Sequence, residues 1–133
     1  MWQAGFILWK GFVVYDLNLT ESYFPAQLDA EVLDTTVGGC LRAAAVRWPD
    51  AEALVEITMA GVSGRRWSYG QLLEESLTLA AALNTRFAKG EKICVWAPNI
   101  PEWVLVEYAC GLAGLVLVTA NPAYQASELR YVL

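Results

Sequence analysis

The chain has no histidine, the side chain that most often binds transition metals and that serves as the base in serine and cysteine nucleophile triads. Charged residues are also scarce, at 17% of 133 residues, and the nine Lys and Arg against fourteen Asp and Glu give a net charge of −5. The basic residues stand singly or in pairs, so they form no stripe of positive charge that could neutralise the phosphates along a nucleic acid. Histidine-based catalysis and nucleic-acid binding are therefore not expected.

Cysteine is scarce as well. The three cysteines, Cys40, Cys94 and Cys110, are odd in number and have no CxxC spacing of the kind found in metal and redox sites. They lie in apolar segments, where a free cysteine behaves as a small hydrophobic residue. Free thiols are typical of a reducing compartment, so we predict a cytoplasmic location and no metal site built on cysteine.

No apolar run is long and uniform enough to cross a membrane. Residues 1–15 are apolar apart from Lys10, but they are too short to span a bilayer and lack the charged start and cleavage site of a signal peptide. The other long run, residues 104–120, is interrupted by Glu107 and two glycines. We predict no transmembrane segment.

Residues 1–34 are predicted to form an N-terminal arm, and residues 1–15 within it have two interpretations. One is an N-terminal arm that packs on its own domain or on a neighbouring subunit. The other is a membrane-surface anchor, which would make the protein peripheral at a membrane, although the basic polar face of such helices is missing. The apolar face of that anchor would consist of Trp2, Phe6, Trp9 and Val13.

Apolar residues are abundant, at 56% of the chain without counting glycine. An ordinary soluble chain has about 45–50% even when glycine is included. The excess predicts that part of the apolar surface meets the rest of a longer polypeptide, a second copy of the chain, or a membrane.

The pattern from Lys92 onward predicts a strand, a helix and a second strand. The apolar runs at residues 92–97 and 115–120 each end in a turn, at Pro98-Asn99 and Asn121-Pro122. The segment between them is apolar almost all round, as in an internal helix that other elements must cover. This is a βαβ unit with parallel strands, so the fold class is α/β. We expect the helix to stay partly uncovered and to drive self-association.

Shorter elements are predicted before this unit. Thr35 or Thr36 caps a helix that Pro49 stops. Residues 53–59 and 66–68 favour two strands of a short β-hairpin. The residues between these strands could instead form a phosphate-binding loop, because they contain two glycines and lead to adjacent arginines, but the Gly-Lys-Ser/Thr ending is missing.

Two further helices complete the prediction. Ser68 and Gln71 fit a capping box that opens a helix ending near residues 88–90. Its adjacent carboxylates, Glu74-Glu75, point about 100° apart and favour a solvated face over an acid/base pair. A last short helix begins around Ser127.

Six short motifs, in this order and spacing, resemble the N-terminal region of the adenylate-forming, AMP-binding acyl-CoA synthetases, most closely those acting on medium- and long-chain fatty acids. The resemblance covers about residues 22–133. The matching residues are Thr36-Val37-Gly38, Arg47-Trp48-Pro49-Asp50, Trp67-Ser68-Tyr69, Lys89-Gly90-Glu91-Lys92, Ala97-Pro98-Asn99 with Glu102-Trp103, and Asn121-Pro122-Ala123-Tyr124 with Glu128-Leu129.

The resemblance implies that residues 35–133 form the first part of the large AMP-binding domain, a partial subdomain with parallel strands, flanking helices and a hairpin. It implies an enzyme that joins a fatty acid to AMP, using ATP and Mg²⁺, and then to CoA. It also implies that the loops after the two strands support an acyl pocket, whereas the residues themselves are equally consistent with turn chemistry alone.

None of the family's catalytic motifs occurs in this sequence, so no catalytic, cofactor-binding or metal-binding residue is predicted. We expect the chain to be inactive alone and to need the remainder of the enzyme as its partner. The alternative is a stand-alone α/β binding or interaction module without catalysis.

Overall fold

The computed structural model describes residues 32–133 of the chain. Within that range, residues Asp34–Leu133 form one compact unit. The arm predicted for residues 1–34 lies almost wholly outside the described residues, and the membrane-surface anchor considered for residues 1–15 lies wholly outside them. Of the helices within that range, none is long and apolar enough to cross a membrane.

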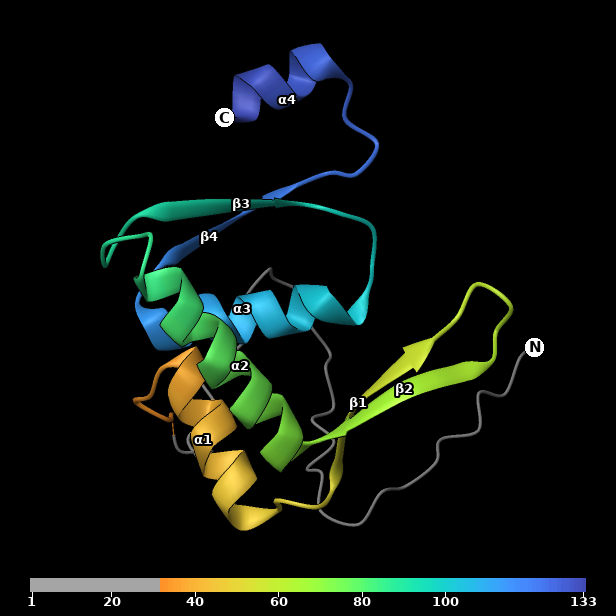
Figure 1. Cartoon of the computed structure of the whole chain (residues 1–133), viewed down its shortest axis with the longest axis vertical. Helices are drawn as coiled ribbons and strands as arrows, with labels where there is room; N and C mark the ends of the chain where they lie inside the picture. The colour runs from red at the N-terminus through yellow and green to blue at the C-terminus, as the bar shows by residue number, and fades with distance from the viewer. Residues whose placement is uncertain (1–31) are drawn as a thin grey trace, which may run out of the picture. The chain divides into compact units, whose positions relative to one another are not determined.

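The described residues form four helices and four strands (Figure 1). Each element that the sequence predicts is present, and most ends lie within a few residues of the expected ones. In chain order the elements are α1 Val37–Arg47, β1 Glu52–Ile57, β2 Ser63–Ser68, α2 Tyr69–Asn84, β3 Lys92–Trp96, α3 Pro101–Ala113, β4 Val116–Ala120 and α4 Ala126–Val132.

Helix α1 begins at a threonine cap and packs closely on α3. The Thr36 hydroxyl oxygen accepts the N–H of Gly39 at 3.0 Å, which confirms one of the two predicted caps. A Cβ on Gly38 would lie 2.8 Å from Cδ2 of Leu112 in α3. The glycine that weakens the first turn of α1 therefore lets the two helices approach each other.

Strands β1 and β2 form an antiparallel hairpin with Leu54 opposite Trp67. The turn between them spans residues 58–62. In it, Gly61 adopts a φ of 72°, a conformation that is unfavourable for residues with a side chain. The turn comes earlier than predicted, and β2 begins at Ser63. The structure confirms a plain hairpin, because the glycine-containing turn leads into a strand and not into a helix.

Helix α2 opens with the predicted capping box. The Ser68 hydroxyl oxygen accepts the N–H of Gln71 at 3.3 Å, and Oε1 of Gln71 accepts the N–H of Ser68 at 2.9 Å. The helix ends at Asn84, earlier than predicted. The N–H groups of Arg86 and Phe87 both bond to the carbonyl of Leu83, which makes a tight turn and brings Phe87 back against the core.

The βαβ unit has parallel strands, as predicted. Strand β3 pairs with β4 from Lys92 opposite Val116 to Trp96 opposite Ala120. Gly114 closes α3 in the left-handed conformation, at φ 73°, and the chain then enters β4. The two strands with their connecting helix, together with the separate hairpin, confirm the α/β fold class.

Two apolar clusters hold the unit together. One combines Ala80 of α2 with small residues of α3 and with Leu115 before β4, and the other joins Leu41 of α1, Trp67 of β2 and Leu72 of α2. Both clusters involve α3, so α1 and α2 cover much of this helix. Its larger apolar side chains, such as those of Val104, Leu105 and Val106, are only half-buried, so the helix is partly uncovered, as expected. The self-association expected of it stays a prediction.

Candidate functional site

The candidate site lies at the carboxyl ends of β3 and β4. Because the strands are parallel and end opposite each other, at Trp96 and Ala120, the loops that follow them leave the same edge of the sheet. Open α/β sheets bind ligands at this edge. The structure thus brings together the two turns that the sequence singled out, Pro98-Asn99 and Asn121-Pro122.

The second loop is organised by Asn121. Its side-chain oxygen accepts the N–H of Ala123 at 2.9 Å, and its carbonyl accepts the N–H of Tyr124 at 3.0 Å. The same carbonyl accepts the indole N–H of Trp96 at 3.0 Å, which ties the end of β3 to the loop after β4. Asn121 is therefore engaged in turn chemistry.

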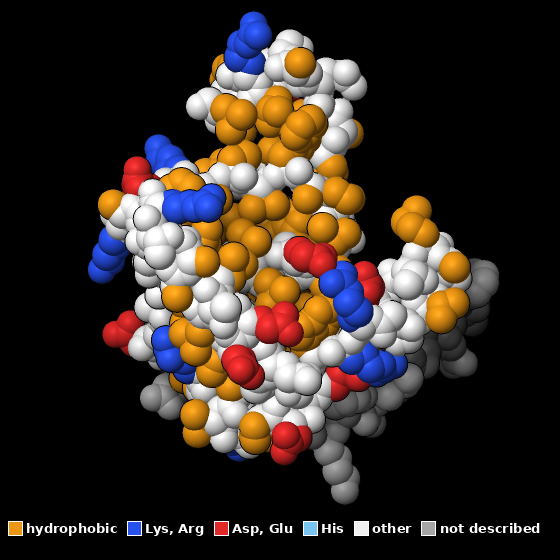
Figure 2. Space-filling model, viewed as in Figure 1, with side chains coloured by type: hydrophobic (Ala, Val, Ile, Leu, Met, Phe, Trp, Pro, Cys, Tyr) orange, Lys and Arg blue, Asp and Glu red, His pale blue; other side chains and the backbone are white. Residues whose placement is uncertain are grey.

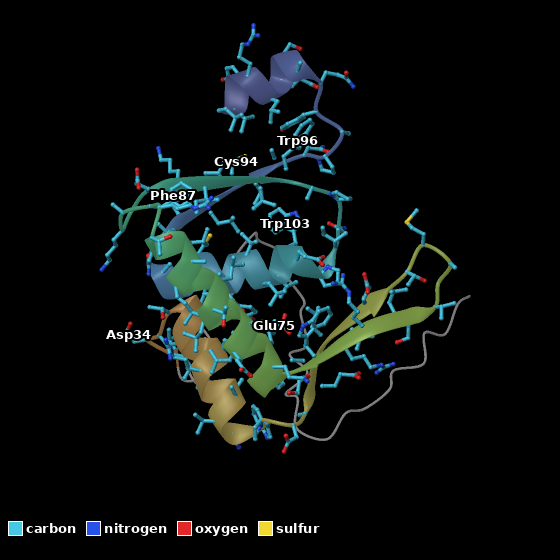
Figure 3. All side chains as sticks on the ribbon, in the orientation of Figure 1. Asp34, Glu75, Phe87, Cys94, Trp96 and Trp103 are labelled. Carbon is cyan, nitrogen blue, oxygen red and sulfur yellow. The ribbon has the colours of Figure 1, made fainter. Side chains whose placement is uncertain are left out.

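The first loop is held by Trp103 of α3. Its indole N–H donates to the carbonyl of Ala97 at 3.3 Å, and Pro101 is buried at the first position of the helix. Asn99, between these two contacts, is exposed and faces a hollow beside the loop. In Figure 3, Trp96 and Trp103 lie on opposite sides of the sheet.

The hollow has a volume of about 560 Å³ and separates β1 from the loop between β3 and α3. Its polar side chains are those of Glu56, Thr58 and Asn99. The other lining residues are apolar: Leu54, Val55, Ile57, Met59, Pro98, Ile100, Pro101, Trp103 and Val104. Its size and lining are in the range of small-molecule sites, but only a few polar groups converge on it.

An ion-pair network lies beside this hollow, on Arg65 of β2. Its Nε donates to Oε2 of Glu56 at 2.9 Å, its Nη2 donates to Oε1 of the same carboxylate at 3.1 Å, and its Nη1 donates to Oε1 of Glu102 at 2.6 Å. Glu102 stands in the first turn of α3, where the helix dipole favours negative charge. The guanidinium therefore fastens the hairpin to the start of α3.

These contacts set the protonation state of the nearby carboxylates. Hydrogen bonds from Arg65 hold the pKa of Glu56 and the pKa of Glu102 below their usual values. Both groups are therefore charged and paired at neutral pH, which makes them poor general acids. The sequence did not single out Arg65, since its two partners are separated from it by 9 and 37 residues.

The rest of the described chain adds little reactive chemistry. Burial raises the pKa of the Cys110 thiol, which lowers its reactivity. Among residues 32–133, no three His, Cys, Asp or Glu side chains gather to hold a metal ion. The arrangement holds two loops at one edge of the sheet, beside an apolar hollow. That no catalytic residue lies in this chain stays a prediction.

The fold, with the loops after β3 and β4 at one edge of the sheet, is that of a known class of α/β enzyme. A family described as AMP-binding enzyme matches residues 41–133. The chain belongs to the AMP-binding enzyme family, and the resemblance inferred from its short motifs is confirmed.

Individual relatives point to acyl-CoA ligases. The chain is 43% identical over 113 residues to the mitochondrial medium-chain acyl-CoA ligase of Mus musculus, a match that covers 84% of this chain and 18% of that protein. It is also 43% identical over 99 residues to the corresponding protein of Homo sapiens, covering 74% of this chain and 15% of that protein. The chain thus spans less than a fifth of the length of these ligases.

Solved structures agree with the sequence matches. The fatty acyl CoA synthetase of Mycobacterium tuberculosis matches with a TM-score of 0.66 and 28% identity, over 74% of this chain and 19% of that one. The N-terminal subdomain of NpsA from Klebsiella oxytoca matches with a TM-score of 0.65 and 25% identity, over 74% of this chain and 24% of that one. These matches confirm the fold of an N-terminal subdomain of adenylate-forming ligases.

Proposed function

We propose that this chain supplies the first part of the AMP-binding domain of an ATP-dependent fatty acid–CoA ligase. The whole enzyme would join a medium- or long-chain fatty acid to AMP, release pyrophosphate, and pass the acyl group to CoA. The observation that carries the proposal is the 43% identity to the mouse medium-chain ligase over 113 residues.

The role of the chain in that enzyme is positional. Its βαβ unit presents the loops after β3 and β4 at one edge, where Trp96 and Asn121 fix the strand ends to each other. The described residues offer no gathering of metal ligands, and their glycine-containing turn leads into a strand. They do not fit Mg²⁺ or a nucleotide phosphate.

A pyrophosphate-release assay tests the predicted inactivity of the isolated chain. The full chain, ATP, Mg²⁺, CoA and a series of fatty acids should give no release above a blank, with the mouse ligase as the positive control. A preparation carrying Leu41→Asp, which disrupts the core around a residue only 2% exposed, controls for contaminating enzymes. Release by the unmodified chain but not by this variant would contradict the prediction.

A chimera tests the positive side of the proposal. In it, this chain replaces the matching stretch of the mouse ligase. Because the two sequences share 43% identity over that stretch, the chimera should fold and activate medium-chain fatty acids. A folded chimera that forms no acyl-adenylate would contradict the proposal.

The second candidate function is a stand-alone α/β interaction module. The observation that favours it is the packing of α1 and α2 on α3, by which the chain covers much of its own crossover helix. Against it stand α4, which has no buried residue, and two apolar residues of the β3–β4 sheet that stay exposed, Trp96 and Val116. Activity of the chimera would exclude a role confined to binding.

The location of the protein stays a prediction. The free cysteines led us to expect a cytoplasmic protein, whereas the mammalian relatives are described as mitochondrial. We propose the mitochondrion as the competing location, to be decided by fractionating cells that express the protein from its natural gene.

A further inference from the structure

The turn end of the β1–β2 hairpin, residues 57–64 and here called the hairpin tip, carries exposed apolar side chains. Ile57 is 66% exposed, Val62 is 62% exposed and Met59 is fully exposed. Every residue from 57 to 64 is exposed, and none of them is charged. In Figure 1 this end of the hairpin points away from the helices, and Figure 2 shows apolar side chains gathered on it. The hairpin tip is therefore a projecting apolar surface.

The turn satisfies several of its own polar groups. The N–H of Thr58 donates to the carbonyl of Val62 at 2.9 Å, and the N–H of Gly61 donates to the carbonyl of Thr58 at 2.8 Å. The hydroxyl oxygen of Thr58 also accepts the N–H of Val62, at 3.3 Å. A segment whose hydrogen bonds are made internally enters a medium without donors and acceptors at a lower cost.

The charged groups behind the hairpin tip neutralise one another. Arg65 pairs with Glu56 and Glu102, and Arg66 pairs with Glu52. Arginines that are paired in this way attract anionic headgroups or phosphates only weakly. The pair between Arg65 and Glu102 also holds the hairpin against the start of α3. The hairpin tip is therefore suited to an uncharged partner.

We propose that the hairpin tip is a membrane-contact site, which inserts Ile57, Met59 and Val62 into the interfacial layer of a lipid bilayer. A projecting tip suits a fluid layer that closes around it, and the flexible thioether side chain of Met59 adapts to such surroundings. A protein partner would instead need a matching cavity and polar groups to pair with, and the turn offers few. The site goes beyond the proposed function and is separate from the anchor considered for residues 1–15.

Co-sedimentation of the full chain with phosphatidylcholine vesicles tests this site. The chain should sediment with these uncharged vesicles, and its absence from the pellet would overturn the proposal. Adding phosphatidylserine should not increase the bound fraction, because the arginines of the hairpin are paired and the chain has a net charge of −5. Binding that rises with phosphatidylserine would identify an electrostatic contact elsewhere and would also overturn the proposal.

Matched substitutions locate the contact. Met59→Asp should lower the affinity for the vesicles about tenfold, because the carboxylate would have to lose its hydration to enter the interfacial layer. Val46→Asp makes the same change in charge on α1, where the side chain is 83% exposed, and should lower the affinity less than about twofold. Circular dichroism verifies that each variant folds. Equal binding by the two variants would assign the contact to another segment, such as residues 1–15, and overturn the proposal.

A gain of binding provides a test in the opposite direction. Met59→Trp should raise the affinity for phosphatidylcholine vesicles about threefold, because tryptophan favours the membrane–water interface. The side chain it replaces is fully exposed, so the folded chain accommodates the larger ring. An affinity that is unchanged or lower would contradict insertion of the hairpin tip.

Light scattering without lipid distinguishes a second copy of the chain from a bilayer. The parent chain and Met59→Asp should have the same mass in solution, because the proposed partner of the hairpin tip is absent. Self-association that Met59→Asp abolishes would identify a second copy as the occupant and overturn the proposal.

Discussion

Replacing Ser76 by alanine is expected to stabilise the folded chain. Ser76 lies between Leu72 and Ala80 on the buried stripe of α2, and its side chain is completely inaccessible to solvent. Its hydroxyl has no hydrogen-bond partner among the described residues. A buried hydroxyl without a partner costs about 1–3 kcal/mol in desolvation.

The expected gain follows from three contributions. Removing the unpaired hydroxyl returns about 1–3 kcal/mol, and alanine has a better helix propensity than serine by about 0.5 kcal/mol. The missing oxygen leaves a small void, which costs less than about 1 kcal/mol. We expect Ser76→Ala to raise the free energy of unfolding by about 1–2 kcal/mol. For a domain of about 100 residues, each kcal/mol raises Tm by roughly 4–8 °C.

Urea unfolding of the full chain, followed by tryptophan fluorescence and circular dichroism, measures the change. Thr78→Ala is the matched control, because Thr78 is exposed on the same helix and its hydroxyl donates to the Glu74 carbonyl at 3.0 Å. That control reports helix propensity at a solvated position. A Ser76→Ala variant that is less stable than the parent, or that gains no more than Thr78→Ala, would refute the reasoning.

Three further predictions concern the core, the turns and the ion pairs. Leu41→Ala should lower the free energy of unfolding by about 2–5 kcal/mol, because Leu41 is 2% exposed; a loss below about 1 kcal/mol in urea would contradict this. Gly90→Ala and Gly114→Ala should each cost about 1–2 kcal/mol, since both glycines have positive φ. Gly114→Ala should cost more in the same assay, because its Cβ would lie 3.1 Å from a lysine side chain while nothing lies within 4 Å of a Cβ at Gly90. The reverse order would be inconsistent with the structure. Arg65→Met should lower stability at neutral pH, and the difference should shrink as the pH falls below about 4.3, the usual pKa of a glutamate. The pKa of Glu56 is lowered in the folded chain, so its stabilising contribution is complete above the unfolded pKa and is lost as the pH falls through the folded one. A difference that stays constant in urea unfolding at a series of pH values would contradict this.

Local chemistry explains which parts of the fold could be predicted. The capping box needs only Ser68 and Gln71, three residues apart, and the Thr36 cap needs only the first turn of its helix. The parallel unit follows from two apolar runs with a helix between them. The caps depend on residues that are close together in the sequence, and the parallel unit depends on a periodic pattern within each of its three consecutive segments.

The features that escaped prediction depend on distant residues. Arg65 meets Glu102 across 37 positions, and no short motif encodes that contact. The end of α2 at Asn84 depends on Phe87 turning back onto the core. The cover of α3 depends on Gly38 letting α1 approach, although propensity alone marks that glycine as unfavourable in a helix.

The candidate site combines, in a single loop, a feature that the sequence predicts and a contact that it does not. The pattern around Asn121 predicted a turn, and the side-chain oxygen is indeed used by the backbone N–H of Ala123. The pattern could not predict the hydrogen bond that the indole N–H of Trp96 donates to the carbonyl of Asn121. This bond joins the ends of the two strands across 25 positions of the sequence. Because Asn121 already serves its own turn, a ligand reaching this edge would meet the exposed ring of Trp96 more readily than the asparagine side chain. These turns therefore act by holding the edge of the sheet in place.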